Sequence, residues 1–251
     1  MKRVLFAFMV LAMALSACTP QPSELAKQAQ VSALALDSLH GSAPECNSMD
    51  ENAMCHDFDI NQYFKSLPRL AMREGYVLDY IIHQDGMGSY PVLYVRGVDQ
   101  TPYTSEAAFT QAQSEGKLLP GDVLEYVEVE DSATGYLDYA VFLLLRGQFY
   151  LGWHANYFDT TVVATPEQLE SLLAATGFGM EIPKEIADEA RKLDLTPVVT
   201  MGEKEVTVSL VLFTKWGGFY RQTFKFNRTS PHTILDSQQE TLVEYECGIM
   251  F

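Results

Sequence analysis

Basic residues are scarce in this sequence. Its 251 residues include 17 Lys and Arg against 33 Asp and Glu, which gives a formal net charge of −16. Nucleic-acid binding depends on Lys and Arg that neutralise phosphates, and flat binding to anionic lipid depends on basic residues as well. The composition therefore argues against both partners. We attribute the acidity to solubility, with divalent cations or a basic partner as the alternatives.

The motifs of several enzyme classes are absent. The sequence contains no HExxH zinc motif, no GxSxG elbow and no phosphate-binding GxxxxGK[ST] loop. No two of the five histidines lie four residues apart, which is the spacing of a helical zinc site. We therefore predict no cofactor, no metal centre and no catalytic constellation.

A calcium loop is also missing, although one stretch begins like one. Asp57-x-Asp59-x-Asn61 fits the first positions, but position six is Gln62 rather than Gly and position twelve is Pro68 rather than Glu. We therefore reject an EF-hand. Weak calcium binding remains an alternative for four acidic residues of this region, namely Asp50, Glu51, Asp57 and Asp59.

The apolar run at the N-terminus is short. It extends from Val4 to Ala17, whereas a helix that crosses a bilayer needs about 20 apolar residues. Two basic residues, Lys2 and Arg3, precede it, and small residues end it. This pattern is typical of a secretory signal, so we expect export.

The run ends in Leu15-Ser16-Ala17-Cys18. This ending resembles the lipobox of bacterial prolipoproteins, and the match covers residues 1–18 alone. The resemblance implies that Cys18 receives a diacylglyceryl group and becomes the acylated N-terminus of the mature chain. Thr19 stands where Asp commonly causes inner-membrane retention in Gram-negative lipoproteins, which favours the outer membrane, facing the periplasm. The alternative is an ordinary signal peptide in which Cys18 is incidental.

Three further cysteines remain for the folded protein: Cys46, Cys55 and Cys247. Export permits disulfides, and the nine-residue spacing within one polar loop favours a bond between Cys46 and Cys55. Cys247 is then a buried free thiol. Because sequence does not determine connectivity, a bond from Cys247 to one of the other two stays open.

The chain divides into a signal peptide at 1–17, a lipid-anchored tether with an N-terminal helix at 18–43, and a single globular domain at 44–251. Residues 23–39 lack Pro and Gly and predict the helix. Its apolar face is weak, so we expect a loosely held helix.

Period-two patterns and capping residues predict an α+β domain, with a mainly antiparallel sheet built from hairpins and helices packed on one face. The predicted helices cover 57–72 (one helix, or two broken at Pro68), 104–115, 165–177 and 183–193. The predicted strands cover 76–82, 90–96, 122–130, 136–145, 148–155, 198–200, 205–214, 218–227 and 243–249.

The tripeptide Leu-Asp-Tyr occurs at 78–80 and again at 137–139. Each copy lies in a predicted hairpin that leads to a capped helix, which suggests a duplicated ββα unit. The alternative is that aromatic-rich strands resemble one another without duplication.

Two polar clusters are weak candidates for ligand binding. His83 and Asp85 share a turn and could orient each other as a general base and its partner, although a tight hairpin also needs Asp and Gly. Aromatic residues in 152–157 could form a glycan- or peptide-stacking surface or belong to the core. The candidates are therefore His83, Asp85, Trp153 and His154.

These observations predict a lipid-anchored bacterial envelope lipoprotein that binds or scaffolds without catalysis. Its expected partners are the membrane, through the lipid on Cys18, and an envelope protein or glycan. One alternative is a lipid-anchored hydrolase of envelope polymers that uses His83, Asp85 and His154. Another is an accessory subunit of an envelope assembly or secretion complex.

Overall fold

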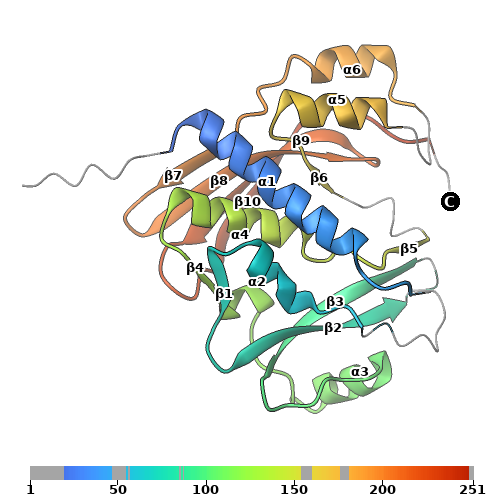
Figure 1. Cartoon of the computed structure of the whole chain (residues 1–251), viewed down its shortest axis with the longest axis vertical. Helices are drawn as coiled ribbons and strands as arrows, with labels where there is room; N and C mark the ends of the chain where they lie inside the picture. Colours follow the sequence, from blue (N-terminus) through green and yellow to red (C-terminus); the bar gives the residue numbers. More distant parts are fainter. Residues whose placement is uncertain are drawn as a thin grey trace, which may run out of the picture.

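Helices and antiparallel sheets make up the fold, and the predicted α+β class is confirmed. The structure is a computed structural model that describes residues 20–46, 55, 57–84, 86, 88–153, 160–175 and 181–248, with the backbone alone for Trp153. Figure 1 shows the elements along the chain.

The helices are α1 (Pro22–Gly41), α2 (Tyr63–Ser66), α3 (Glu106–Ser114), α4 (Ala133–Leu145), α5 (Pro166–Ala174) and α6 (Lys184–Ala190), with 3-10 turns η1 (Ile60–Gln62) and η2 (Val123–Tyr126). The strands are β1 (Leu70–Met72), β2 (Tyr76–Gln84), β3 (Gly88–Gly97), β4 (Val127–Val129), β5 (Gly152–Trp153), β6 (Thr161–Val162), β7 (Val198–Met201), β8 (Glu205–Thr214), β9 (Gly218–Asn227) and β10 (Ile234–Val243).

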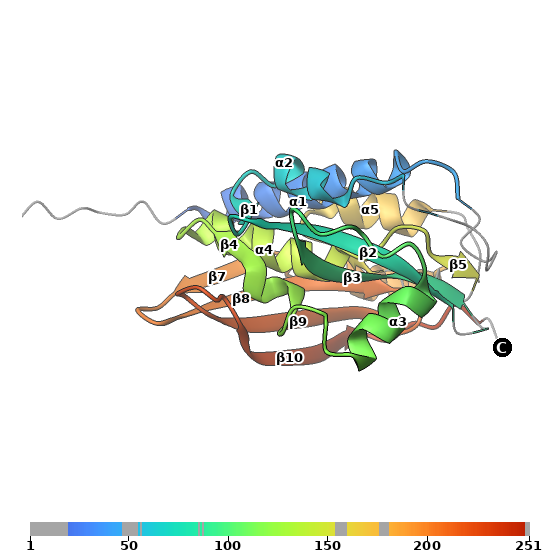
Figure 2. The same cartoon turned by 90° about the horizontal axis from the view of Figure 1, so that it is seen from below.

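Helix α4 forms the centre of the molecule. Figure 2 shows it between the sheet that contains β8, β9 and β10 and the layer that contains α1 and α2. Ten of its residues are buried. A helix that is apolar on all sides belongs in an interior, and each large side chain buried there contributes about 1.5–3 kcal/mol.

The prediction of a hairpin over 122–130 and 136–145 is wrong, because the second segment lies within α4. A short apolar run does not distinguish a buried strand from a buried helix. The Ser132 hydroxyl accepts the N–H of Gly135 at 3.0 Å and caps the helix. Gly135 also permits a close approach, since a Cβ there would lie 2.2 Å from the Glu130 carbonyl oxygen. The first segment forms η2 and β4, which pairs with β1.

The largest sheet confirms the predicted β8–β9 hairpin. Its order is β10-β9-β8-β6, and β7 pairs with β8 as well. Alternate β8 side chains from Val206 to Leu212 join the main core together with residues of α1 and α4. A second, smaller cluster joins α5 and α6 to the end of β8 and to the C-terminal tail.

The strand predicted at 243–249 is misplaced, because the last strand is β10 and ends at Val243. Most of β10 is exposed and polar, so it lacks the apolar alternation that identifies a strand, and its backbone pairing with β9 defines it. The predicted alternation of burial in the tail is present: Tyr245 and Cys247 are buried, whereas Glu244 and Glu246 are exposed. Ile249 lies outside the described residues.

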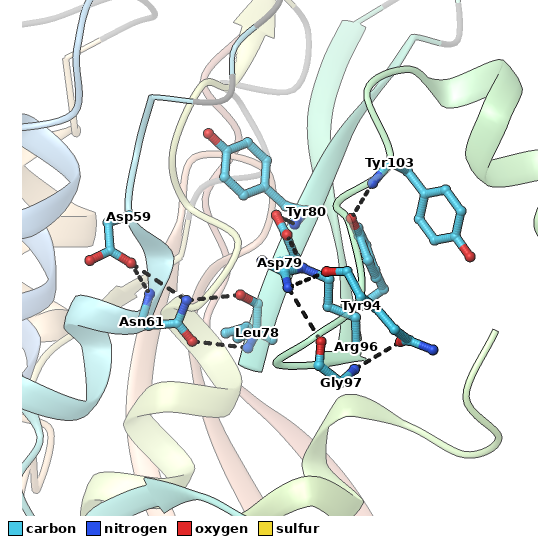
Figure 3. A network of polar contacts seen from close by, with 10 residues as sticks. Asp59, Asn61, Leu78, Asp79, Tyr80, Tyr94, Arg96, Gly97 and Tyr103 are labelled. Carbon is cyan, nitrogen blue, oxygen red and sulfur yellow. Dashed lines mark hydrogen bonds and ion pairs between the residues drawn. The ribbon is translucent and has the colours of Figure 1, made fainter. Parts of the chain in front are cut away.

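The predicted β2–β3 hairpin is confirmed, and β5 extends it to three strands. The Asn61 side chain donates to the Leu78 carbonyl and accepts the Leu78 N–H, both at 2.9 Å, so it occupies part of the other edge of β2 (Figure 3). The helix predicted over 57–72 is too long at both ends, because only η1 and α2 (60–66) are helical and Leu70–Met72 is β1.

Helix α1 confirms the predicted N-terminal helix but is not loosely held. Leu25, Ala29, Ala33 and Leu36 are buried in the main core. The helix predicted after Thr104 or Ser105 is confirmed as α3, with Ser105 as its cap. The helices predicted from Thr165 and Pro183 are confirmed as α5 and α6.

Candidate functional site

The β2–β3 hairpin carries His83 near its turn. Nδ1 of His83 hydrogen-bonds Oε1 of Glu106, the first residue of α3. The other Glu106 oxygen accepts the N–H of Gln84 at 3.4 Å. Tyr90 lies opposite His83 in the hairpin, and the two ring centroids are 5.1 Å apart. The His83 and Glu106 side chains are 34% and 37% exposed. The sequence proposed Asp85 as the partner of His83, and Glu106 is a carboxylate partner that it did not propose.

The hairpin that carries His83 meets the start of the second predicted cluster at one end of this sheet. Gly88 of β3 lies opposite Trp153 of β5 in the strand register. Asp85 and His154, like Cys18, lie outside the described residues. The structure therefore brings the hairpin and Gly152–Trp153 together without describing the full set of side chains that the hydrolase alternative requires.

The predicted disulfide between Cys46 and Cys55 is present, with 5.6 Å between the two Cα atoms. Cys55 is buried. Cys247 is a buried free thiol, which removes the alternative in which it bonds one of the other two.

Metal-ligating side chains do not cluster in the described part of the chain, where no three of His, Cys, Asp and Glu lie together. Asp59 instead caps η1, because its carboxylate accepts the N–H of Asn61 at 3.1 Å. Asp50 and Glu51 lie outside the described residues.

A polar cavity lies beside the C-terminal end of α1. Its volume is about 440 Å³, which falls within the range of about 300–1,000 Å³ typical of ligand sites. Three segments line it: the end of α1, the segment after α4, and the start of β6. The lining residues are Asp37, His40, Gly41, Gln148, Phe149, Tyr150, Leu151, Thr160 and Thr161.

His40 has a defined tautomer in this cavity. Its Nε2 lies 2.8 Å from the Tyr63 hydroxyl, which donates its single proton to the Arg146 carbonyl at 2.8 Å. The Tyr63 oxygen must therefore accept from Nε2–H, which makes Nδ1 the hydrogen-bond acceptor. Burial lowers the pKa of His40 to about 4, so the ring is neutral at neutral pH.

Tyr150 has an unusual backbone. Its φ is +51°, a left-handed conformation that is rare for a bulky residue. Its ring lies 5.5 Å from that of Phe149 and 6.3 Å from those of Phe58 and Tyr80, measured between centroids. Strain of this kind costs about 1–3 kcal/mol and concentrates at functional sites.

Gln148 connects the two ends of the segment between α4 and β6. Its Oε1 accepts the Thr160 N–H at 3.2 Å, which presents the amide NH₂ as the remaining donor group. The predicted cluster 152–157 belongs to the same segment of the sequence.

Sequence reasoning missed this cavity. Its residues come from positions far apart in the chain, and each has an ordinary local role. The one usable signal was the aromatic pair Phe149 and Tyr150 directly after α4, which the predicted strand over 148–155 concealed.

Comparison with protein-family models, with curated proteins and with solved structures gave no match. Among the helices that the structure describes, none has the length and apolar character needed to cross a bilayer.

Proposed function

We propose that this chain is a lipid-anchored lipoprotein of the bacterial envelope, held through Cys18 in the outer membrane, whose folded domain binds or scaffolds. The observation that carries the proposal is the spacing of Lys2, Arg3, the apolar run and Leu15-Ser16-Ala17-Cys18. The Cys46–Cys55 disulfide supports it, because structural disulfides form in oxidising compartments outside the cytosol.

The position of α1 adds a geometric consequence. Helix α1 begins at Pro22, four residues after Cys18, so the connecting chain spans at most about 14 Å. Because α1 belongs to the core, this short connection holds the whole domain close to the bilayer. Such a tether suits a protein that acts at the membrane surface.

Fatty-acid labelling tests the anchor. Cells that express the full chain are grown with radioactive palmitate, and the protein is compared with Cys18→Ala. We expect label in the parent and loss of label in Cys18→Ala, together with release from the membrane fraction. Cys247→Ala is the matched control and should keep its label. Equal labelling of Cys18→Ala and the parent would overturn the proposal.

A second candidate function is hydrolysis of an envelope polymer, and the contact between His83 and Glu106 favours it. A carboxylate that binds one ring nitrogen leaves the other as a general base. Hydrolysis of purified cell-wall material by the parent, with about a hundredfold loss in both His83→Gln and Glu106→Gln, would support this candidate. Absence of hydrolysis by the parent would reject it.

A further inference from the structure

The cavity at the end of α1 combines donors and acceptors in a way that suits hydroxyl groups. His40 presents an acceptor nitrogen, because Nε2 donates to Tyr63. Asp37 supplies a carboxylate at the exposed rim. Gln148 contributes amide hydrogens, since its oxygen accepts from Thr160. A hydroxyl group both donates and accepts, so it can satisfy either kind of partner.

Two hydroxyl side chains complete the polar lining. Thr160 and Thr161 lie where the chain enters β6. The Thr160 hydroxyl hydrogen-bonds Tyr220 and can still accept, whereas the Thr161 hydroxyl can donate or accept. A ligand with several hydroxyls around one ring can therefore find both acceptors and donors among the side chains that line the cavity.

Tyr150 adds an aromatic surface to this polar lining. Its ring belongs to the cluster with Phe58, Tyr80 and Phe149, so its position is fixed by packing. The strained φ of +51° is retained at a residue that lines the cavity. An aromatic ring can pack against the C–H face of a cyclic polyol while the hydroxyls at its rim meet polar groups.

Charge selects among possible ligands. None of the described residues that line the cavity is Lys or Arg, and the chain carries a net charge of −16. An anionic ligand would lie close to the Asp37 carboxylate in a chain of strongly negative net charge, which disfavours phosphates and carboxylates. A neutral ligand avoids this cost.

We infer that this cavity binds one ring of a neutral, hydroxyl-rich ligand, which is the chemistry of a sugar unit. The inference deepens the proposed envelope function, on which it rests for the location of the ligand, and assigns glycan as the class of partner. The occupant is a neutral ring rather than a phosphate or a charged peptide.

The test uses the full chain purified from membranes in detergent, with an N-acetylglucosamine tetramer and maltotetraose as probes. Saturation-transfer NMR detects contact, and calorimetry gives the dissociation constant, which we expect to be about 1 mM or lower for at least one sugar. Inorganic phosphate should not compete.

Two variants locate binding at the cavity. Gln148→Glu keeps an oxygen for the Thr160 N–H but removes the amide donor, and Thr161→Val removes a hydroxyl at nearly constant shape. Each should weaken sugar binding about tenfold, because a buried polar group of the ligand loses its partner. Gln113→Glu makes the same chemical change on the exposed face of α3 and should leave the affinity unchanged.

Three outcomes would overturn the inference: no contact with either sugar, unchanged affinity in both cavity variants, or competition by phosphate. The outcome for the anchor is separable, because binding is measured without reference to the lipid. If Cys18→Ala keeps its label and sugar binding is intact, the anchor alone is rejected. If Cys18→Ala loses its label and the parent does not bind sugar, the cavity assignment alone is rejected.

Discussion

The same tripeptide, Leu-Asp-Tyr, occupies β2 at 78–80 and α4 at 137–139. In both places the Leu and the Tyr are at most 1% exposed. The aspartates differ, because the Asp79 side chain is 15% exposed whereas that of Asp138 is completely buried. One sequence therefore meets two environments, and the duplicated ββα unit is excluded as an explanation of the match.

In β2 the period of two separates the acid from its neighbours. Leu78 and Tyr80 point into the core while Asp79 points to the other face. There Oδ2 of Asp79 accepts from Nε of Arg96 at 2.7 Å, and Arg96 also donates to the Gln100 carbonyl (Figure 3). The strand thus lets the acid reach a partner near solvent.

In α4 no such separation is possible, since the helix is enclosed on all sides. Asp138 accepts from Ser32 at 2.6 Å, from Gln28 at 2.9 Å and from Arg69 at 3.2 Å. A buried carboxylate is tolerated where donors satisfy it. Two of these donors belong to α1, so Asp138 binds the N-terminal helix to the central one.

Replacement of each aspartate should give the largest difference in stability between the two copies of the tripeptide. We expect Asp138→Ala to lower the free energy of unfolding by about 3–5 kcal/mol, because Ser32, Gln28 and Arg69 all lose their acceptor. Asp79→Ala should lower it by about 1–2 kcal/mol, because Arg96 loses one charged partner but keeps the Gln100 carbonyl as an acceptor. Urea denaturation measures both, and equal losses would contradict the comparison.

Truncation of the two leucines should give similar losses of stability in the two copies. Leu78 and Leu137 are both buried in the main core, so Leu78→Ala and Leu137→Ala should each cost about 2–5 kcal/mol through lost contacts and a cavity. The measurement is again urea denaturation. A loss below about 1 kcal/mol in either variant would show that one leucine is not part of a well-packed core.

Local chemistry was sufficient for the elements that begin or end with clear signals. Ser105 and Thr165 cap their helices as expected, and the hairpin turns lie where glycines allow them. Helix α4 could not be predicted in this way, because its apolar residues lie on every face and show no helical periodicity. Strand β10 was missed for the opposite reason, since its polar residues show no buried face.

The candidate site was predictable only where one segment supplies it. The sequence identified His83, but its partner Glu106 starts a helix 23 residues later. His40 becomes informative only because Tyr63 fixes its tautomer. These relations depend on how distant segments pack, and spacing along the chain does not encode them.

The tyrosines offer the smallest test, through alkaline pH. Burial raises the pKa of Tyr139. The pKa of Tyr80 is also raised, mainly by burial and to a smaller extent by the nearby Tyr150. The Tyr139 hydroxyl reaches the His232 carbonyl at 2.9 Å. Above pH about 10 the unfolded chain releases these protons while the folded protein keeps them, so stability must fall as the pH rises.

We therefore expect Tyr139→Phe to flatten the decline in unfolding free energy above pH about 10 by up to about 1.4 kcal/mol per pH unit. Tyr80→Phe should flatten it in the same direction. Urea denaturation between neutral and alkaline pH provides the measurement, with Tyr90→Phe, at an exposed residue of β3, as the matched control for loss of a phenol. An unaltered slope in Tyr139→Phe would mean that its phenol ionises as readily in the folded protein as in the unfolded chain, which contradicts complete burial in the helix.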